Sequence, residues 1–158
     1  MNDFLGIDLA VVPTFVAHDA STLDVQAVTK VVRLRNAPGS LRRNVETDLG
    51  VIADRENLAQ ALILRLLTPR GSLAVLGHAA YGSRLHELIG QNKTPALRNL
   101  CRALILEVVA QEPRVEDKAV ELTFDPAAET SSSFVFTLAV QPRSDDAAPL
   151  GLTLEVAL

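Results

Sequence analysis

The spacing of apolar residues changes near residue 113, and this change limits the folds open to the chain. Between residues 51 and 112 the apolar residues recur every three or four positions, the spacing of one face of a helix. From residue 114 to the end they alternate with polar residues, which is the period of a half-buried strand. Helices followed by a run of short strands predict an α+β fold, with helices packed on a small antiparallel sheet.

Three helical segments are predicted in the first of these stretches. Asp54 is a plausible N-cap for a helix from about Arg55 to Leu67, which the Thr68–Gly71 turn ends. A short helix capped by Ser83 follows, with Leu85, Leu88 and Ile89 inward. Thr94 caps the third helix, which has a proline at its first position and ends before Pro113. Its predicted apolar stripe consists of Leu97, Leu100, Cys101, Leu104 and Val108.

Three strands are predicted after the helices. Their alternating segments run from Val120 to Phe124, from Phe134 to Val140 and from Leu150 to Leu158, with turn-rich links between them. Such segments form an antiparallel three-stranded meander whose apolar face covers the helices.

The first 50 residues differ from the rest and are predicted to form an extended N-terminal arm with one or two peripheral strands. One apolar run, Ile7–Val12, stops at Pro13. A second, Val28–Leu34, is interspersed with basic residues that are typical of exposed strand edges, and a turn follows at residues 36–40. We therefore divide the chain into an arm, residues 1–50, and an α+β domain, residues 51–158.

Composition excludes several classes of function. The formal net charge is −4 and the pI is about 5.3, so neither nucleic-acid binding nor membrane association is expected. No apolar segment is long enough to span a membrane, and no secretory signal is evident at the N-terminus. With one cysteine and no such signal, the protein is expected to be cytoplasmic when synthesised.

No catalytic constellation is visible in the sequence. Cys101 lies on the apolar stripe of the third helix, which favours a buried hydrophobe over a nucleophile. His78 and His86 have no nearby acidic pair that would complete a metal site. Acidic residues cluster between Glu107 and Asp117, but such clusters are usually a solvated surface. We therefore predict no catalytic, cofactor-binding or metal-binding residues.

The segment Glu112-Pro113-Arg114 is harder to explain as ordinary surface. An acidic side chain near a helix C-terminus opposes the helix dipole, at a cost of roughly 0.3–1 kcal/mol. A cation would compensate, either Arg114 or an arginine of a partner protein. Taken alone, the residues also fit a simple helix-to-strand turn with exposed charges.

The order of several short segments resembles a known family. The stretch from Asn57 to Gly71 is followed by Gly77-His78, by Tyr81–Leu85 and, after another helix, by Glu112-Pro113-Arg114-Val115. This order resembles the baseplate wedge, or sheath-initiator, family of contractile tails that carries the Glu-Pro-Arg motif. The family includes a phage baseplate wedge protein, the small baseplate subunit of type VI secretion systems and counterparts in extracellular contractile injection systems. The resemblance covers about residues 51–125.

The resemblance implies a structural, non-enzymatic role in a baseplate that serves as the platform for sheath assembly. The implied partners are other wedge proteins, sheath subunits and inner tube or hub proteins, with several copies of the chain in a symmetric ring of an assembled particle. The partner-binding residues that it implies are Glu112, Pro113, Arg114, Arg70, Gly71, Tyr81, Gly82 and Arg84.

The arm is longer than in short family members, so its role is not implied by the resemblance. We expect that the arm, or the C-terminal strand, pairs edge to edge with a sheath subunit. Two other functions stay open: a peptidoglycan-cleaving, lysozyme-like enzyme, and a small adaptor unrelated to contractile machines.

Overall fold

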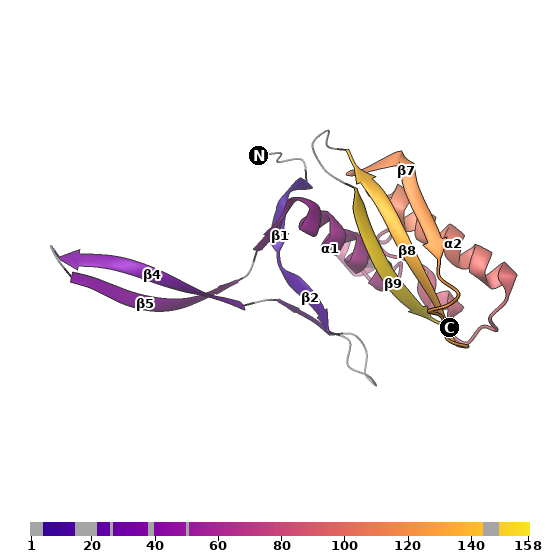
Figure 1. Cartoon of the computed structure of the whole chain (residues 1–158), viewed down its shortest axis with the longest axis horizontal. Coiled ribbons are helices and arrows are strands. Elements are labelled where there is room, and N and C mark those ends of the chain that lie inside the picture. Colours follow the sequence, from indigo (N-terminus) through magenta and orange to yellow (C-terminus); the bar gives the residue numbers. More distant parts are fainter. Residues whose placement is uncertain (1–4, 15–21, 26, 38–39, 50, 144–148) are drawn as a thin grey trace.

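The computed structural model describes residues 5–14, 22–25, 27–37, 40–49, 51–143 and 149–158. Two α-helices and a three-stranded sheet form the body of the molecule, and further strands that pair in twos precede them (Figure 1). The helices are α1 (Asp54–Leu67) and α2 (Pro95–Ala110), with the 3₁₀ turns η2 (Ala74–Leu76) and η3 (Leu85–Leu88) between them. The predicted α+β class is confirmed.

The sheet consists of β7 (Val115–Phe124), β8 (Ser133–Pro142) and β9 (Leu150–Ala157), in the order β7-β8-β9 and antiparallel throughout. Both helices lie against one face of it (Figure 1). That face carries the residues predicted from the two-residue period, since Phe134, Phe136, Leu138 and Val140 are all buried. The predicted meander is therefore confirmed.

The helices supply the other half of the core. Because a helix packed on a sheet must bury one stripe, each contributes residues three or four apart. Fully or almost fully buried side chains come from both helices: Leu58, Leu62 and Leu66 on α1, and Cys101, Leu104, Ile105, Val108 and Val109 on α2.

The beginning of α2 follows the prediction, whereas the beginning of α1 does not. The Thr94 hydroxyl accepts a hydrogen bond from the Leu97 amide at 3.1 Å, and Pro95 occupies the first turn. At α1 the N-cap position belongs to Ala53, with no side-chain cap, so the prediction of Asp54 as the cap is wrong. The strand β6 (Val51–Ala53) runs directly into the helix, and Asp54 itself has a positive φ of 54°.

Two predicted core positions are wrong. Ile89 is 65% exposed, because the turn η3 ends at Leu88 and the chain leaves the core there. Leu100 is 47% exposed, although it shares the helical period of α2 with the buried residues. Leu100 is exposed because the apolar stripe of α2 is wider than the part of the helix surface that the sheet and α1 cover.

The N-terminal region contains more strands than the one or two predicted. The described residues include β1 (Ile7–Leu9), β2 (Val11–Thr14), β3 (Thr22–Val25), β4 (Ala27–Ala37) and β5 (Ser40–Leu49). They pair in twos: β1 with β6, β2 with β3, and β4 with β5. The apolar run Ile7–Val12 is divided between β1 and β2, and β2 continues through Pro13, which pairs with Leu23.

The arm is extended, as predicted, but its first residues belong to the body. Leu5 is 2% exposed and lies in the core cluster. The hairpin of β4 and β5 points away from the body (Figure 1). The link between these strands lies within the predicted turn at residues 36–40, but residues 36, 37 and 40 belong to the strands, and residues 38–39 lie outside the described part of the chain. The division at residue 50 stays a prediction.

Within the residues that the structure describes, neither helix is long and apolar enough to cross a membrane.

Candidate docking corner at Glu112

Glu112 lies just after α2, where the chain turns into β7, and it is almost completely buried. Only 3% of its side chain is exposed. Its Oε1 accepts a hydrogen bond from the Arg114 Nε at 2.7 Å, and its Oε2 lies 3.6 Å from the Arg65 Nη2. The cations that the dipole argument required are therefore two arginines of this chain, one of them on α1.

Burial and charge act in opposite directions on Glu112. Burial raises the pKa of this carboxyl, whereas the hydrogen bonds and charge of Arg114 and the charge of Arg65 lower it, and the net effect is a pKa below its usual value. The side chain is therefore a carboxylate at neutral pH. It acts as a fixed anion that holds two arginines in place.

We call Glu112 with its two arginines, Arg65 and Arg114, the Glu112 corner. Arg114 connects this corner to the N-terminal segment. Its Nη1 donates to the Leu5 carbonyl at 3.1 Å, and the same carbonyl accepts from the side-chain Nδ2 of Asn57 at 2.8 Å. Pro113, between the two charged residues of the motif, is exposed. The motif thus joins the end of α2, the beginning of β7 and the first residues of the chain at one point.

Arg65 links the corner to the loop between α1 and η3. Its guanidinium carbon lies 4.6 Å from the centre of the Tyr81 ring, in cation–π contact. Burial raises the pKa of the Tyr81 hydroxyl above its ordinary value. Tyr81 is thereby packed against the charged corner at the place where the loop returns to the body.

The two ends of this loop are fixed to each other by backbone hydrogen bonds. The Ser83 amide donates to the Thr68 carbonyl at 2.8 Å, and the Arg70 amide donates to the Ser83 carbonyl at 2.7 Å. Gly82 lies against this junction with a φ of 104°, and a Cβ there would lie 2.4 Å from the Thr68 oxygen. Only glycine meets both the positive φ and the close backbone approach.

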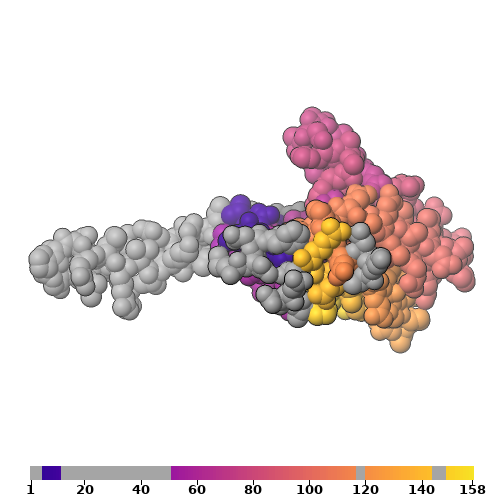
Figure 2. Space-filling model, turned by 90° about the horizontal axis from the view of Figure 1, so that it is seen from above, coloured from indigo at the N-terminus to yellow at the C-terminus, as the bar shows by residue number. Residues whose placement is uncertain are grey.

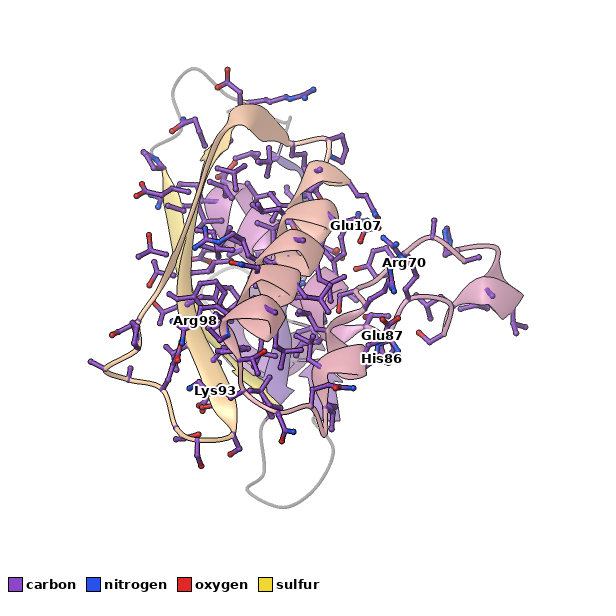
Figure 3. The ribbon with its side chains drawn as sticks, turned by 90° about the vertical axis from the view of Figure 1, so that its right-hand side faces the viewer. Arg70, His86, Glu87, Lys93, Arg98 and Glu107 are labelled. Atoms are coloured by element: carbon purple, nitrogen blue, oxygen red, sulfur yellow. The ribbon has the colours of Figure 1, made fainter. Side chains whose placement is uncertain are left out.

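A second ion pair supports the loop from α2. The Arg70 guanidinium contacts the Glu107 carboxylate, and Figure 3 shows the two side chains together at the foot of the projecting loop. The Glu107 side chain is 41% exposed, so this pair is more weakly held than the one at Glu112. Glu107, the first residue of the acidic cluster noted in the sequence, serves here as a partner of an arginine.

The loop itself projects from the body (Figure 2), and it carries exposed apolar side chains. Within η2, Val75 is 97% exposed and Leu76 is 70% exposed. Gly77 ends this turn with a φ of 83°. We call residues 71–81 the apical loop.

The predicted partner-binding residues divide into three groups. Glu112, Arg114 and Tyr81 meet around Arg65, and Arg70 and Gly82 form the base of the apical loop, next to exposed Gly71. Arg84 is separate, since it pairs with Glu87 at 2.8 Å on the surface.

Sequence reasoning missed Arg65, Val75 and Leu76. A lone arginine within the apolar sequence of α1 is the signal that could have identified Arg65, because a cation among buried residues needs an anionic partner. Val75 and Leu76 carry no comparable signal, because two apolar residues in a loop are as often buried as exposed.

A second charge cluster lies on another part of the surface and fixes the link between β7 and β8. The Glu129 side chain, 2% exposed, pairs with Lys93 at 2.8 Å and with Arg98 at 2.6 Å. Both cations also lie over aromatic rings of the sheet. Figure 3 shows Lys93 and Arg98 well away from Arg70, so this cluster is no part of the corner.

The cysteine and the described histidines lie apart from one another and do not form a reactive site. Cys101 is fully buried, and burial raises the pKa of its thiol to about 12, which confirms the prediction of a small core residue. His78 and His86 are exposed, whereas His18 lies outside the described residues. Among the described residues no three histidine, cysteine or acidic side chains gather as they would around a metal ion.

The fold is similar to that of a solved structure. The chain is similar to a crystal structure described as a candidate tail lysozyme from Geobacter sulfurreducens, with 19% sequence identity and a TM-score of 0.55. The match covers 65% of this chain and 89% of that one. At this identity the likeness concerns the fold. No protein-family model matches the sequence, and no curated protein matches it.

Proposed function

We propose that this protein is a structural wedge subunit of the baseplate of a contractile injection machine, and that the apical loop and the Glu112 corner form its docking surface. The proposal is supported by the resemblance of the Glu112-Pro113-Arg114 segment to the wedge family and by a fold similar to that of a protein described as a tail lysozyme. The observation that carries it is the apolar tip of a loop whose base is closed by backbone hydrogen bonds and contacts, through Tyr81, the buried ion pairs at Glu112.

The tip of the loop is suited to fill an apolar pocket of another protein. Burial of Val75 and Leu76 in such a pocket would contribute about 1.5–3 kcal/mol of free energy for each side chain. Because Gly82, Ser83 and the Arg70–Glu107 pair hold the base of the loop, little conformational entropy is lost when the tip binds. Rigid presentation of exposed apolar residues is typical of a binding site.

The geometry at Glu112 also bears on the enzymatic alternative, which the name of the similar structure suggests. A glycosidase general acid needs a carboxyl group with a raised pKa that can reach the substrate. The pKa of Glu112 is lowered, its side chain is buried, and both of its oxygens face arginines. These properties favour a positioning role for this carboxylate over proton donation.

The test is incorporation of loop variants into particles. In cells that express the chain with the sheath, tube and wedge genes around it, Val75→Asp/Leu76→Asp should abolish incorporation of the protein into baseplates and reduce sheathed particles. The isolated variant should keep its stability to within about 0.5 kcal/mol, because both side chains are exposed.

Ile89→Asp is the control, because it places an aspartate at another exposed apolar residue, outside the apical loop. It should assemble normally. Normal particles from the loop variant would contradict the proposed docking surface. Cell-wall turnover by the purified protein that is lost in Glu112→Gln or Glu107→Gln would instead establish the enzyme.

A further inference from the structure

The first described residues of the chain lie against α1 and are buried at two positions (Figure 1). Leu5 is 2% exposed and belongs to the core cluster, and Ala10 is 5% exposed. Between them, Ile7 and Leu9 of β1 are 62% and 39% exposed. We call residues 5–11 the strap, because one buried side chain near each end holds it while its middle is open to solvent.

The side chain of Gln60 on α1 binds the backbone of the strap twice. Its Oε1 accepts a hydrogen bond from the Val11 amide at 2.7 Å, and its Nε2 donates to the Leu9 carbonyl at 2.8 Å. Gln60 is itself buried, and a buried amide group without partners is costly. The hydrogen bonds of this side chain therefore depend on the strap being in place.

The other end of the strap contacts the Glu112 corner. The Leu5 carbonyl accepts from the Nη1 of Arg114 at 3.1 Å, while the Nε of the same guanidinium donates to Glu112 at 2.7 Å. Because the guanidinium is planar and presents its donors in a fixed geometry, it reaches both acceptors in one orientation. The position of the strap and the orientation of Arg114 are therefore linked.

The strap also closes the base of the arm. Its strand β1 pairs with the short strand β6, and the Gly6 carbonyl accepts from the Asp54 amide at 3.3 Å. Asp54 has a φ of 54°, which is uncommon outside glycine and costs free energy. Loss of the bond to Gly6 would allow Asp54 to take an ordinary helical or extended conformation, so this strain favours release of the strap.

We infer that the strap is a releasable element that couples the Glu112 corner to the base of the arm. It stays closed while Arg114 donates to the Leu5 carbonyl, and it opens more readily when this bond is lost, while the helices and the β7–β9 sheet stay folded. Few buried side chains and a short strand pairing are features of segments that open before the rest of a protein unfolds. This coupling belongs to the fold of the chain and does not depend on the baseplate role proposed above.

The experiment is thiol labelling of the full-length chain that carries Ala10→Cys. This substitution adds one sulfur atom at a buried position of the strap, so the introduced thiol should react when the strap opens. Cys101, fully buried in the core, reports unfolding of the body in the same molecule. The introduced thiol should react at least about tenfold faster than Cys101, because the strap opens more often than the whole protein unfolds. Equal rates of the two thiols would overturn the inference.

Gln60→Ala, added to Ala10→Cys, removes both bonds between the Gln60 side chain and the strap. It should speed the reaction of the introduced thiol by about tenfold or more and change that of Cys101 by less than about threefold. Gln91→Ala is the matched control, because it truncates the same type of side chain at an exposed position, and it should change neither rate. An unchanged rate of the introduced thiol in Gln60→Ala, or equal acceleration of both thiols, would show that the strap is not a separate element.

Arg114→Lys, also added to Ala10→Cys, tests the coupling. Lysine keeps a positive charge beside Glu112 but lacks the guanidinium that also reaches the Leu5 carbonyl. The introduced thiol should react about fivefold faster or more, with little change at Cys101. Arg84→Lys, which makes the same change in a surface ion pair, should leave both rates as they are. If Arg114→Lys has no more effect than Arg84→Lys, the strap is not coupled to the Glu112 corner.

Discussion

Replacement of Glu112 by glutamine tests the buried network at the corner directly. The change keeps the size of the side chain and one acceptor oxygen but removes the charge. Arg65 and Arg114, whose side chains are only 16% and 21% exposed, then lose the anion between them. We expect Glu112→Gln to lower the free energy of unfolding.

The size of the effect follows from the geometry. Loss of one partner of a fully buried ion pair costs about 3–5 kcal/mol. The arginines keep some contact with water, the Arg65 distance is 3.6 Å, and Arg114 retains its bond to the Leu5 carbonyl, so a smaller loss of about 2–3 kcal/mol is expected.

The assay is urea denaturation followed by circular dichroism, with Glu107→Gln as the control. Glu107 also pairs with an arginine, but its side chain is 41% exposed, so its replacement should cost less than about 1 kcal/mol. Hydrogen exchange at the amides of Arg70 and Ser83 should quicken in Glu112→Gln if the corner holds the loop base. Equal stability of the two variants would refute the reasoning.

Three further outcomes are expected. Because the folded-state pKa of Glu112 is lowered, its contribution to stability is present above its ordinary pKa of 4.5 and is lost as the pH falls through the folded-state value. The loss of stability toward acid pH should therefore be shallower in Glu112→Gln than in the wild type. Identical pH profiles of the two proteins would contradict this expectation. Gly82→Ala should lower the urea midpoint more than Gly77→Ala, because both glycines have positive φ but only Gly82 has backbone within 3 Å of the new Cβ. Cys101 should react with a thiol reagent only after unfolding, and rapid labelling of the native chain would show that the thiol is accessible.

The sequence alone determined the types and order of the main elements, because local spacing and local capping decide them. The period of two through Phe134 and Phe136 specified which face of β8 is buried, and Thr94-Pro95 specified where α2 begins. These signals lie within a few residues of the structure that they predict, so no knowledge of distant contacts is needed.

Only the tertiary structure decided how residues from separate elements combine. The resemblance pointed to Glu112 and Arg114. The second cation beside the Glu112 carboxylate is Arg65 on α1, which lies 47 positions earlier in the chain. Leu100 has the spacing of a core residue and is nevertheless exposed, because burial depends on which face of a helix its neighbours cover. The exposure of the apical loop is decided in the same way, because the folded chain carries this loop away from the helices and the sheet (Figure 2).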